Sequence, residues 1–310
     1  MYKIFLIIQL LSQLVVNYDI KNVEASIIPG KPINLFSTRS DFLRQECGLR
    51  NANGIEFQNN IEGEAEYGEF PWIVAILKIN ITLDFITDIY QCGGTLISAK
   101  IVLTAAHCVN KLDVKSLKIR AGEWDTQSTD EPFPYSEYYA SSIIIHEAFN
   151  SANLQNDIAL LKLKDNVRFA QHINTICLPA QGHDYDGKRC FVSGWGKDVF
   201  GKVGVYQTIL KKIEIPTVNF IECQDILRKK RMGKRFILDS SFMCAGGEQE
   251  IDACTGDGGS PLMCPFDNST NHYYQVGIVA WGIKCGDKGV PGVYVNVAKF
   301  SSWIFKFIQE

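Results

Sequence analysis

Short apolar stretches rich in β-branched residues follow one another along most of this chain, and glycine, asparagine and aspartate separate them. Examples are residues 72–79, 94–97 and 274–281. Runs of this length, bounded by turn-forming residues, are typical of strands rather than helices. The chain has 310 residues and is 46% hydrophobic, which is enough to build a large core. The pattern therefore predicts an all-β fold, either a barrel or a sandwich.

The C-terminal segment departs from this pattern. Apolar side chains recur there with helical spacing, at Phe300, Trp303, Ile304, Phe307 and Ile308. This spacing places them on one face of a helix. We expect an amphipathic helix to close the domain.

The N-terminus has the pattern of a secretory signal. A short start containing Lys3 precedes the apolar residues 4–16, and the polar residues 17–19 follow. The apolar run is shorter than the roughly 20 residues that a membrane span needs. We therefore interpret residues 1–17 as a cleaved signal peptide rather than an uncleaved anchor, and expect a secreted, extracellular protein.

The chain contains ten cysteines, and an oxidising extracellular space favours disulfides. We expect five disulfides rather than thiols or metal ligands. The sequence has no CxxC pair and no HExxH motif, which argues against a zinc site. Two glycosylation sequons, at Asn80 and Asn268, agree with the secretory route.

Net charge bears on the binding partners, and local polarity bears on the domain boundaries. The formal net charge is -3 at pH 7, so nothing attracts the whole chain to nucleic acid or to an acidic membrane. Residues 18–58 are polar and turn-rich and contain one cysteine, Cys47. We interpret them as an exposed leader tethered by Cys47, and place the β-rich domain at residues 59–310.

Three motifs bear on chemistry. Leu-Thr-Ala-Ala-His-Cys contains His107, Asn-Asp-Ile-Ala-Leu contains Asp157, and Gly-Asp-Gly-Gly-Ser-Pro-Leu occupies residues 256–262. In this order they resemble the histidine, aspartate and nucleophile segments of the chymotrypsin/trypsin family of serine proteases. Further matches extend the resemblance over nearly all of the chain from Cys47 onward, and include residues 92–98, 176–179, 192–196 and 279–282.

The resemblance implies two six-stranded antiparallel β-barrels with a C-terminal α-helix, and a site between the barrels. It also implies four cysteine pairs within the domain, and the two cysteines left over would tie the leader to it. The expected disulfides are Cys92–Cys108, Cys190–Cys264, Cys223–Cys244, Cys254–Cys285 and Cys47–Cys177.

The residue that would attack the substrate is missing. In the family a serine hydroxyl attacks a carbonyl, a histidine takes its proton and a buried aspartate fixes the histidine's tautomer. His107 and Asp157 match two of these positions, but the family's loop reads Gly-Asp-Ser-Gly-Gly-Pro, so Gly258 matches the serine. Ser260 follows two residues later, so its Cα lies up to about 7 Å from that of Gly258. The base must approach the nucleophile to about 3 Å, so Ser260 is not expected to replace the missing serine. The triad is degenerate, and we predict that the chain is not an enzyme.

The activation terminus also departs from the family. Active members begin with an Ile-Val-Gly-Gly-type terminus, whose amine pairs with the aspartate before the serine. The matching residues 59–62 read Asn-Asn-Ile-Glu and follow Gln58 rather than arginine. Asp257 is retained without this partner, so we expect a zymogen-like or otherwise adapted loop.

Remnants of a substrate site accompany the degenerate triad. By the resemblance, Asp252 matches the floor of the primary specificity pocket and Gly282 and Gly292 its entrance, while Gly256 and Gly258 match the oxyanion hole. A carboxylate at that floor would attract arginine or lysine. Either binding survives the loss of cleavage, or the pocket is inherited without present use.

A basic run occupies residues 228–235, where six of eight side chains are cationic. A solvated helix end or loop, a docking or polyanion site, and a proteolytic processing site are all compatible with it.

An acidic stretch between Glu123 and Glu137 falls near the loop that binds calcium in some family members. It offers hard oxygen ligands without a defined spacing, so calcium near Glu123 is the single metal candidate.

Residues 47–51 and 66–72, with the Gly-Asp-Gly-Gly-Ser-Pro loop, most resemble arthropod clip-domain serine protease homologues that act as non-catalytic cofactors of prophenoloxidase activation. A clip domain needs six cysteines, and only Cys47 precedes the domain. The resemblance implies a scaffold or cofactor in melanisation and innate immunity, with prophenoloxidase or cascade proteases as partners. The alternatives are a binding decoy that inhibits such a cascade, similar to venom homologues, an active hydrolase, or recognition of microbes or other partners.

Overall fold

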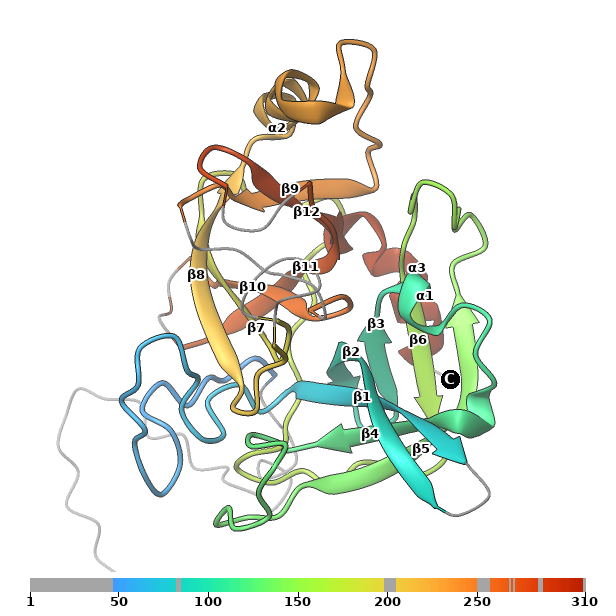
Figure 1. Cartoon of the computed structure of the whole chain (residues 1–310), viewed down its shortest axis with the longest axis vertical. Coiled ribbons are helices and arrows are strands. Elements are labelled where there is room, and N and C mark those ends of the chain that lie inside the picture. The colour runs from blue at the N-terminus through green and yellow to red at the C-terminus, as the bar shows by residue number, and fades with distance from the viewer. Residues whose placement is uncertain are drawn as a thin grey trace, which may run out of the picture. The chain divides into compact units, whose positions relative to one another are not determined.

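The computed structural model describes residues 47–81, 85–197, 205–249, 257–267, 269, 271–283 and 287–308. Within these ranges the strands form two closed antiparallel barrels, with the orders β1-β2-β3-β6-β5-β4 and β10-β11-β12-β9-β8-β7 (Figure 1). The expected all-β fold of two six-stranded barrels is confirmed. The expected signal peptide and residues 18–46 of the expected leader lie outside the described residues.

The first barrel comprises β1 (Ile73–Ile81), β2 (Ile86–Ser98), β3 (Ile101–Thr104), β4 (Leu117–Ala121), β5 (Ser136–Ile145) and β6 (Ala159–Leu163). The second comprises β7 (Arg189–Gly194), β8 (Lys211–Val218), β9 (Phe242–Gly246), β10 (Pro261–Pro265), β11 (Tyr273–Trp281) and β12 (Pro291–Asn296). The helical elements are α1 (Ala106–Val109), η2 (Val114–Ser116), α2 (Phe220–Leu227), η3 (Arg228–Met232), η4 (Val297–Lys299) and α3 (Ser301–Ile308). None of the described helices is long and apolar enough to cross a membrane.

The two barrels are joined through buried contacts. Trp72, fully buried at the start of the first barrel, donates its indole N–H to Met263 Sδ of β10 at 2.9 Å. The N–H of Gly93 on β2 donates to the carbonyl of Gly258, which precedes β10, at 3.0 Å. These contacts fix the segment around Gly258 against the first barrel.

The C-terminal helix forms as its apolar spacing predicts. In α3 the side chains of Trp303 and Ile304 are buried. The indole N–H of Trp303 donates to Glu147 Oε2, which follows β5, at 3.1 Å. The helix that ends the second barrel is thus anchored on the first.

Disulfides join the expected cysteines within the described residues. The pairs present are Cys47–Cys177, Cys92–Cys108, Cys190–Cys264 and Cys223–Cys244. The expected pair Cys254–Cys285 lies outside the described residues.

Residues 47–58, which we call the N-terminal strap, contact the second barrel, although six of the twelve are exposed. Leu49 forms a β-bridge with His272, and the N–H of Tyr273 donates to the carbonyl of Gly48 at 2.9 Å. Gly48 has φ +75°, and a Cβ there would collide with the Tyr273 carbonyl. Only glycine allows this conformation and this close approach.

A buried ion pair anchors the strap. The guanidinium of Arg50 donates from Nε to Glu69 Oε1 at 2.9 Å, and lies 4.3 Å from the centroid of the Phe191 ring. The Glu69 side chain is fully buried, and its other oxygen accepts from Lys212 Nζ at 2.7 Å. One buried carboxylate therefore holds two cations from distant parts of the sequence.

Acid sensitivity is expected at His172, which packs between the rings of Phe133 and Tyr67. Burial lowers the pKa of His172, and its hydrogen bond to the Pro134 carbonyl offsets this only in part. Because the pKa of His172 in the folded state lies below the unfolded value of about 6.5, protonation favours the unfolded chain. This residue therefore costs no stability above about pH 6.5, and the loss of stability grows as the pH falls below that value. In thermal unfolding between pH 7 and pH 5, His172→Gln should lose less stability than the wild type. The exposed His183→Gln is the control, and parallel pH profiles for wild type and His172→Gln would refute the assignment.

Candidate functional site

A histidine and an aspartate form a fixed pair at the junction of the barrels. His107 lies on α1, directly after β3, and Asp157 lies just before β6. Asp157 Oδ1 accepts the backbone N–H of His107 at 2.7 Å, and Oδ2 lies 2.6 Å from His107 Nδ1. The Asp157 side chain is fully buried, whereas that of His107 is 29% exposed. The pair orients the imidazole so that Nε2 faces Gly258, the side from which a general base would act.

Gly258 faces that base without a side chain. A Cβ built on Gly258 would lie 2.7 Å from His107 Nε2 and 3.3 Å from Cε1. Favourable contacts between such atoms lie at about 3.5 to 4.0 Å. Gly258, the position predicted to match the family's serine, therefore lies directly opposite the histidine, and the ring already takes part of the space that a side chain there would need.

The disulfide beside the histidine excludes a metal at this point. Cys92, His107 and Cys108 place one sulfur or nitrogen atom each within 4.8 Å of one another. Cys92 and Cys108 are bonded to each other, however, so neither offers a thiolate to a metal.

Ser260 is not placed to act as the nucleophile. Its side chain is fully buried. A Cβ on Gly93 would collide with Ser260 Oγ, and one on Gly194 would lie 2.8 Å from it. The hydroxyl is thus enclosed between two backbone segments, where no substrate carbonyl can reach it.

The segment that matches the activation terminus lies at the surface. Ile61 is 54% exposed, and the N–H of Asn60 before it donates to Glu66 at 3.1 Å. Asp257 Oδ1 instead accepts the N–H of Gly196 at 2.8 Å, an approach that a Cβ on Gly196 would block. Asp257 thus has a backbone partner among the described residues, and the expected zymogen-like or otherwise adapted loop stays a prediction.

Comparison with protein families now decides the classification. The model of the trypsin family matches residues 61–304, which is most of the chain. This chain belongs to the trypsin family. The expected membership is thereby confirmed.

The relatives of this trypsin-family chain include proteins named inactive. It is 49% identical over 284 residues to phenoloxidase-activating factor 2 of Galleria mellonella, covering 89% of this chain and 93% of that protein. It is 44% identical over 264 residues to inactive CLIP domain-containing serine protease A3 of Aedes aegypti, covering 84% of this chain and 53% of that protein. Inactive CLIP domain-containing serine protease A8 of Anopheles gambiae is 40% identical over 276 residues, which cover 88% of this chain and 74% of that protein. The expected resemblance to non-catalytic clip-domain-type homologues is confirmed.

Some of the predicted pocket and glycosylation positions of this trypsin-family chain lie within the described residues, and others lie outside them. Gly292 pairs with Ala245 in the ladder between β12 and β9, and a Cβ on Gly282 would meet nothing within 4 Å. Asn80 is exposed near the end of β1, as glycosylation requires. The predicted positions outside the described residues are Asp252, Gly256 and Asn268.

The calcium candidate does not fit a metal. Arg120 Nη1 donates to Glu123 Oε2 at 2.8 Å, and Nη2 of the same guanidinium donates to Glu137 at 2.9 Å. Burial nevertheless raises the pKa of Glu123 above its ordinary value. Calcium takes six to eight oxygen ligands, and an arginine already neutralises two of these carboxylates. Of the nearby acids, Glu131 alone has a buried oxygen without a hydrogen-bond partner within the described residues.

A surface hollow of about 380 Å³ lies between residues 152–155 and the segment that follows the basic run, and it was not predicted from the sequence. We call it the apolar hollow. One side is formed by residues just before Asp157, and the other by residues after the basic run and by Trp281. Its apolar lining includes Leu154, Met232, Phe236, Ile237, Phe242 and Trp281. These residues are far apart in the sequence, so the only local signal was the apolar pair Phe236-Ile237 after the cations.

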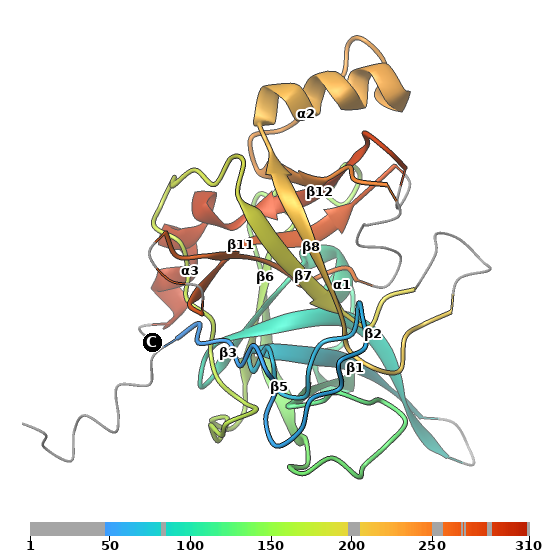
Figure 2. The same ribbon diagram turned by 90° about the vertical axis from the view of Figure 1, so that its left-hand side faces the viewer.

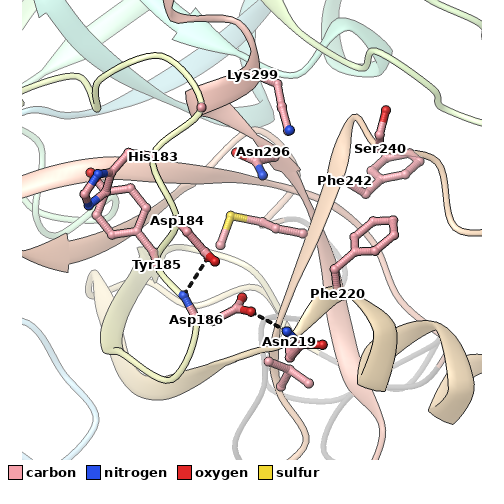
Figure 3. A pocket seen from close by; sticks show the side chains of 13 residues that line it. His183, Asp184, Tyr185, Asp186, Asn219, Phe220, Ser240, Phe242, Asn296 and Lys299 are labelled. Atoms are coloured by element: carbon pink, nitrogen blue, oxygen red, sulfur yellow. Dashed lines mark hydrogen bonds between the residues drawn. The ribbon is translucent and has the colours of Figure 1, made fainter.

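An acidic hollow of about 330 Å³ lies at the beginning of α2 (Figure 3). Asn219, the N-cap of α2, donates from Nδ2 to Asp186 Oδ2 at 2.6 Å, and the N–H of Asp186 donates to Asp184 Oδ1 at 3.0 Å. Burial raises the pKa of Asp186, and the nearby charge of Asp184 adds to the increase. Carboxylates at the N-terminal end of a helix suit its dipole, so this cluster has a structural explanation.

Proposed function

We propose that this chain is a secreted, non-catalytic serine protease homologue that acts as a cofactor in phenoloxidase activation. The observation that carries the proposal is the pairing of an oriented base, His107, with Gly258, which has no side chain. The names of the relatives support it, since two are called inactive and one a phenoloxidase-activating factor.

The chemistry argues for binding rather than cleavage. Loss of the serine from such a triad costs about 10⁶ in rate, and what remains comes from the oxyanion hole and substrate positioning. Ser260 is buried, and Asp257 accepts a hydrogen bond from the Gly196 N–H. A protease fold without a nucleophile can still hold a partner, so we assign it the role of a scaffold that presents prophenoloxidase to an active cascade protease.

A reconstituted activation reaction tests this role. Purified prophenoloxidase and its activating protease are mixed with and without the chain, and diphenol oxidation is followed by absorbance. We expect a several-fold increase at stoichiometric amounts. The variant His107→Ala should give the same increase, because the proposed role uses no proton transfer.

Each other outcome has a definite meaning. No change on addition of the folded chain contradicts the cofactor role. Suppression of oxidation identifies the decoy function instead. An increase that His107→Ala abolishes contradicts the non-catalytic role.

A further inference from the structure

The basic run is displayed on an ordered projection at the end of α2. The helix continues from Leu227 directly into the π-helical turn η3, which ends at Gly233 with φ +82°. Figures 1 and 2 both show α2 at the end of the second barrel remote from β1 and β5. Four of the six cations therefore occur on a helix end, and Lys234 and Arg235 lie in the turn that follows it.

Four of the six cations in the basic run have no anionic or hydrogen-bonding partner among the described residues. Arg228 donates to the Phe236 carbonyl at 2.6 Å and lies 3.3 Å from Asp225, and Lys230 donates to the Lys288 carbonyl at 3.4 Å. The remaining four are exposed and make no salt bridge or side-chain hydrogen bond with the described residues: Lys229, Arg231, Lys234 and Arg235.

Elsewhere in the described part of the chain, some exposed cations are paired, and those without a salt bridge, such as Lys100, Lys111 and Arg168, are spread along the sequence rather than gathered within seven residues. Arg189 bonds to Glu214 and Glu248, and Lys188 bonds to Asp267. Neighbouring like charges without counterions repel one another and destabilise a helix end slightly, by an amount similar to the gain from an attractive pair. The C-terminal helix dipole tolerates cations, but it does not require four unpaired ones.

The projection is held in place before any partner binds. Cys223 of α2 is bonded to Cys244 of β9, and Leu227 is fully buried. The N–H of Leu238 donates to Gln224 Oε1 at 3.0 Å, which anchors the chain as it returns. An ordered surface loses less conformational entropy on binding than a mobile loop does.

The apolar hollow adjoins the cations, so a ligand that covers both surfaces must carry apolar groups as well as negative charge. Met232 belongs to the basic turn itself and lines the hollow, while Ile237, 74% exposed, lies at its edge. A sulfated polysaccharide would engage the cations and leave this apolar surface in water. A protein segment with both acidic and apolar side chains can cover both surfaces.

We propose that the basic turn and the apolar hollow together dock an acidic segment of a partner protein. Its carboxylates would face Lys229, Arg231, Lys234 and Arg235, and one bulky apolar side chain would enter the hollow. The apolar hollow begins at the residues just before Asp157, so the proposed surface adjoins the His107–Asp157 pair without including it. The proposal does not depend on a role in phenoloxidase activation.

Fluorescence anisotropy with synthetic peptides tests the proposal on the full folded chain. The probe is a labelled peptide with Leu-Phe between two blocks of glutamate and aspartate, and its comparison peptide has Ser-Ser at the centre. Because the apolar pair buries surface, we expect the Leu-Phe peptide to bind at least about tenfold more tightly. Binding of both should weaken between about 0.05 and 0.5 M salt, since the Debye length shortens.

Two charge-reversed variants separate a specific site from net charge. The docking variant carries Lys229→Glu, Arg231→Glu, Lys234→Glu and Arg235→Glu. The matched control reverses four exposed cations of the first barrel: Lys100→Glu, Lys111→Glu, Lys115→Glu and Arg168→Glu. We expect the docking variant to bind the Leu-Phe peptide at least about tenfold more weakly and the control to change by less than about twofold.

A third variant, Ile237→Ser, removes apolar surface without changing charge. It should weaken the Leu-Phe peptide several-fold and leave the Ser-Ser peptide unchanged. Thermal unfolding confirms that each variant is folded before its binding is compared. If heparin binds while both peptides bind equally or not at all, the surface is a polyanion site and the proposal is wrong. Equal weakening in the docking and control variants, or cleavage at residues 228–235 without peptide binding, overturns it as well.

Discussion

Gly258→Ser is expected to leave hydrolysis of an arginyl ester at least about 10⁴-fold below that of an active trypsin-family protease, although it restores the missing hydroxyl. A side chain at Gly258 would bring its Cβ to 2.7 Å from His107 Nε2, so the imidazole must shift. A shift loosens the 2.6 Å contact between Nδ1 and Asp157, which holds the histidine in its productive orientation. The measurement is kcat/KM for the ester, combined with titration of any acylated serine.

A second variant makes this result interpretable. Any activity of Gly258→Ser that runs through the triad must vanish when His107→Ala is added, whereas a contaminating protease would persist. Activity within about a hundredfold of an active family member, lost in the double variant, would contradict the expectation. It would mean that the missing hydroxyl is the only defect, and that neither the histidine position nor the bond between Asp257 and Gly196 limits catalysis.

Arg50→Met should lower the free energy of unfolding by about 3–5 kcal/mol, because it leaves the fully buried carboxylate of Glu69 with Lys212 as its single cation partner. In a chain of this size the loss corresponds to a decrease in Tm of about 10 °C. Thermal unfolding followed by circular dichroism measures it. The control is Arg189→Met, whose arginine is 49% exposed and pairs with Glu214, and which should change stability by less than about 1 kcal/mol. Similar shifts for the two variants would show that the strap is not anchored by the buried pair.

The β-rich fold was predictable because its strands are short, apolar and bounded by turn residues. The spacing from Phe300 to Ile308 predicted α3 in the same way, since one helical face had to be buried. The positions of His107, Asp157 and Gly258 followed from motifs, which local sequence carries completely. What the motifs could not give is the distance between Gly258 and the imidazole, because it depends on how two barrels pack.

The N-terminal strap was not predictable for a related reason. Its sequence is polar and turn-rich, which locally indicates exposure. Its attachment to the domain depends on non-local partners: Arg50 reaches Glu69, and Gly48 meets Tyr273, more than 200 residues along the chain. Ile55 is likewise buried although its neighbours are polar. The apolar hollow escaped prediction similarly, since Leu154, Phe236 and Trp281 meet only in the folded chain.

The bond between Cys47 and Cys177 has a consequence for the fate of the chain after proteolysis. It bridges across the exposed stretch around Ile61, so a protease that cuts there produces two chains that remain covalently joined. The product would migrate as one species without a reducing agent and as two with it. Whatever precedes Cys47 in the mature protein would stay covalently attached to the domain instead of diffusing away.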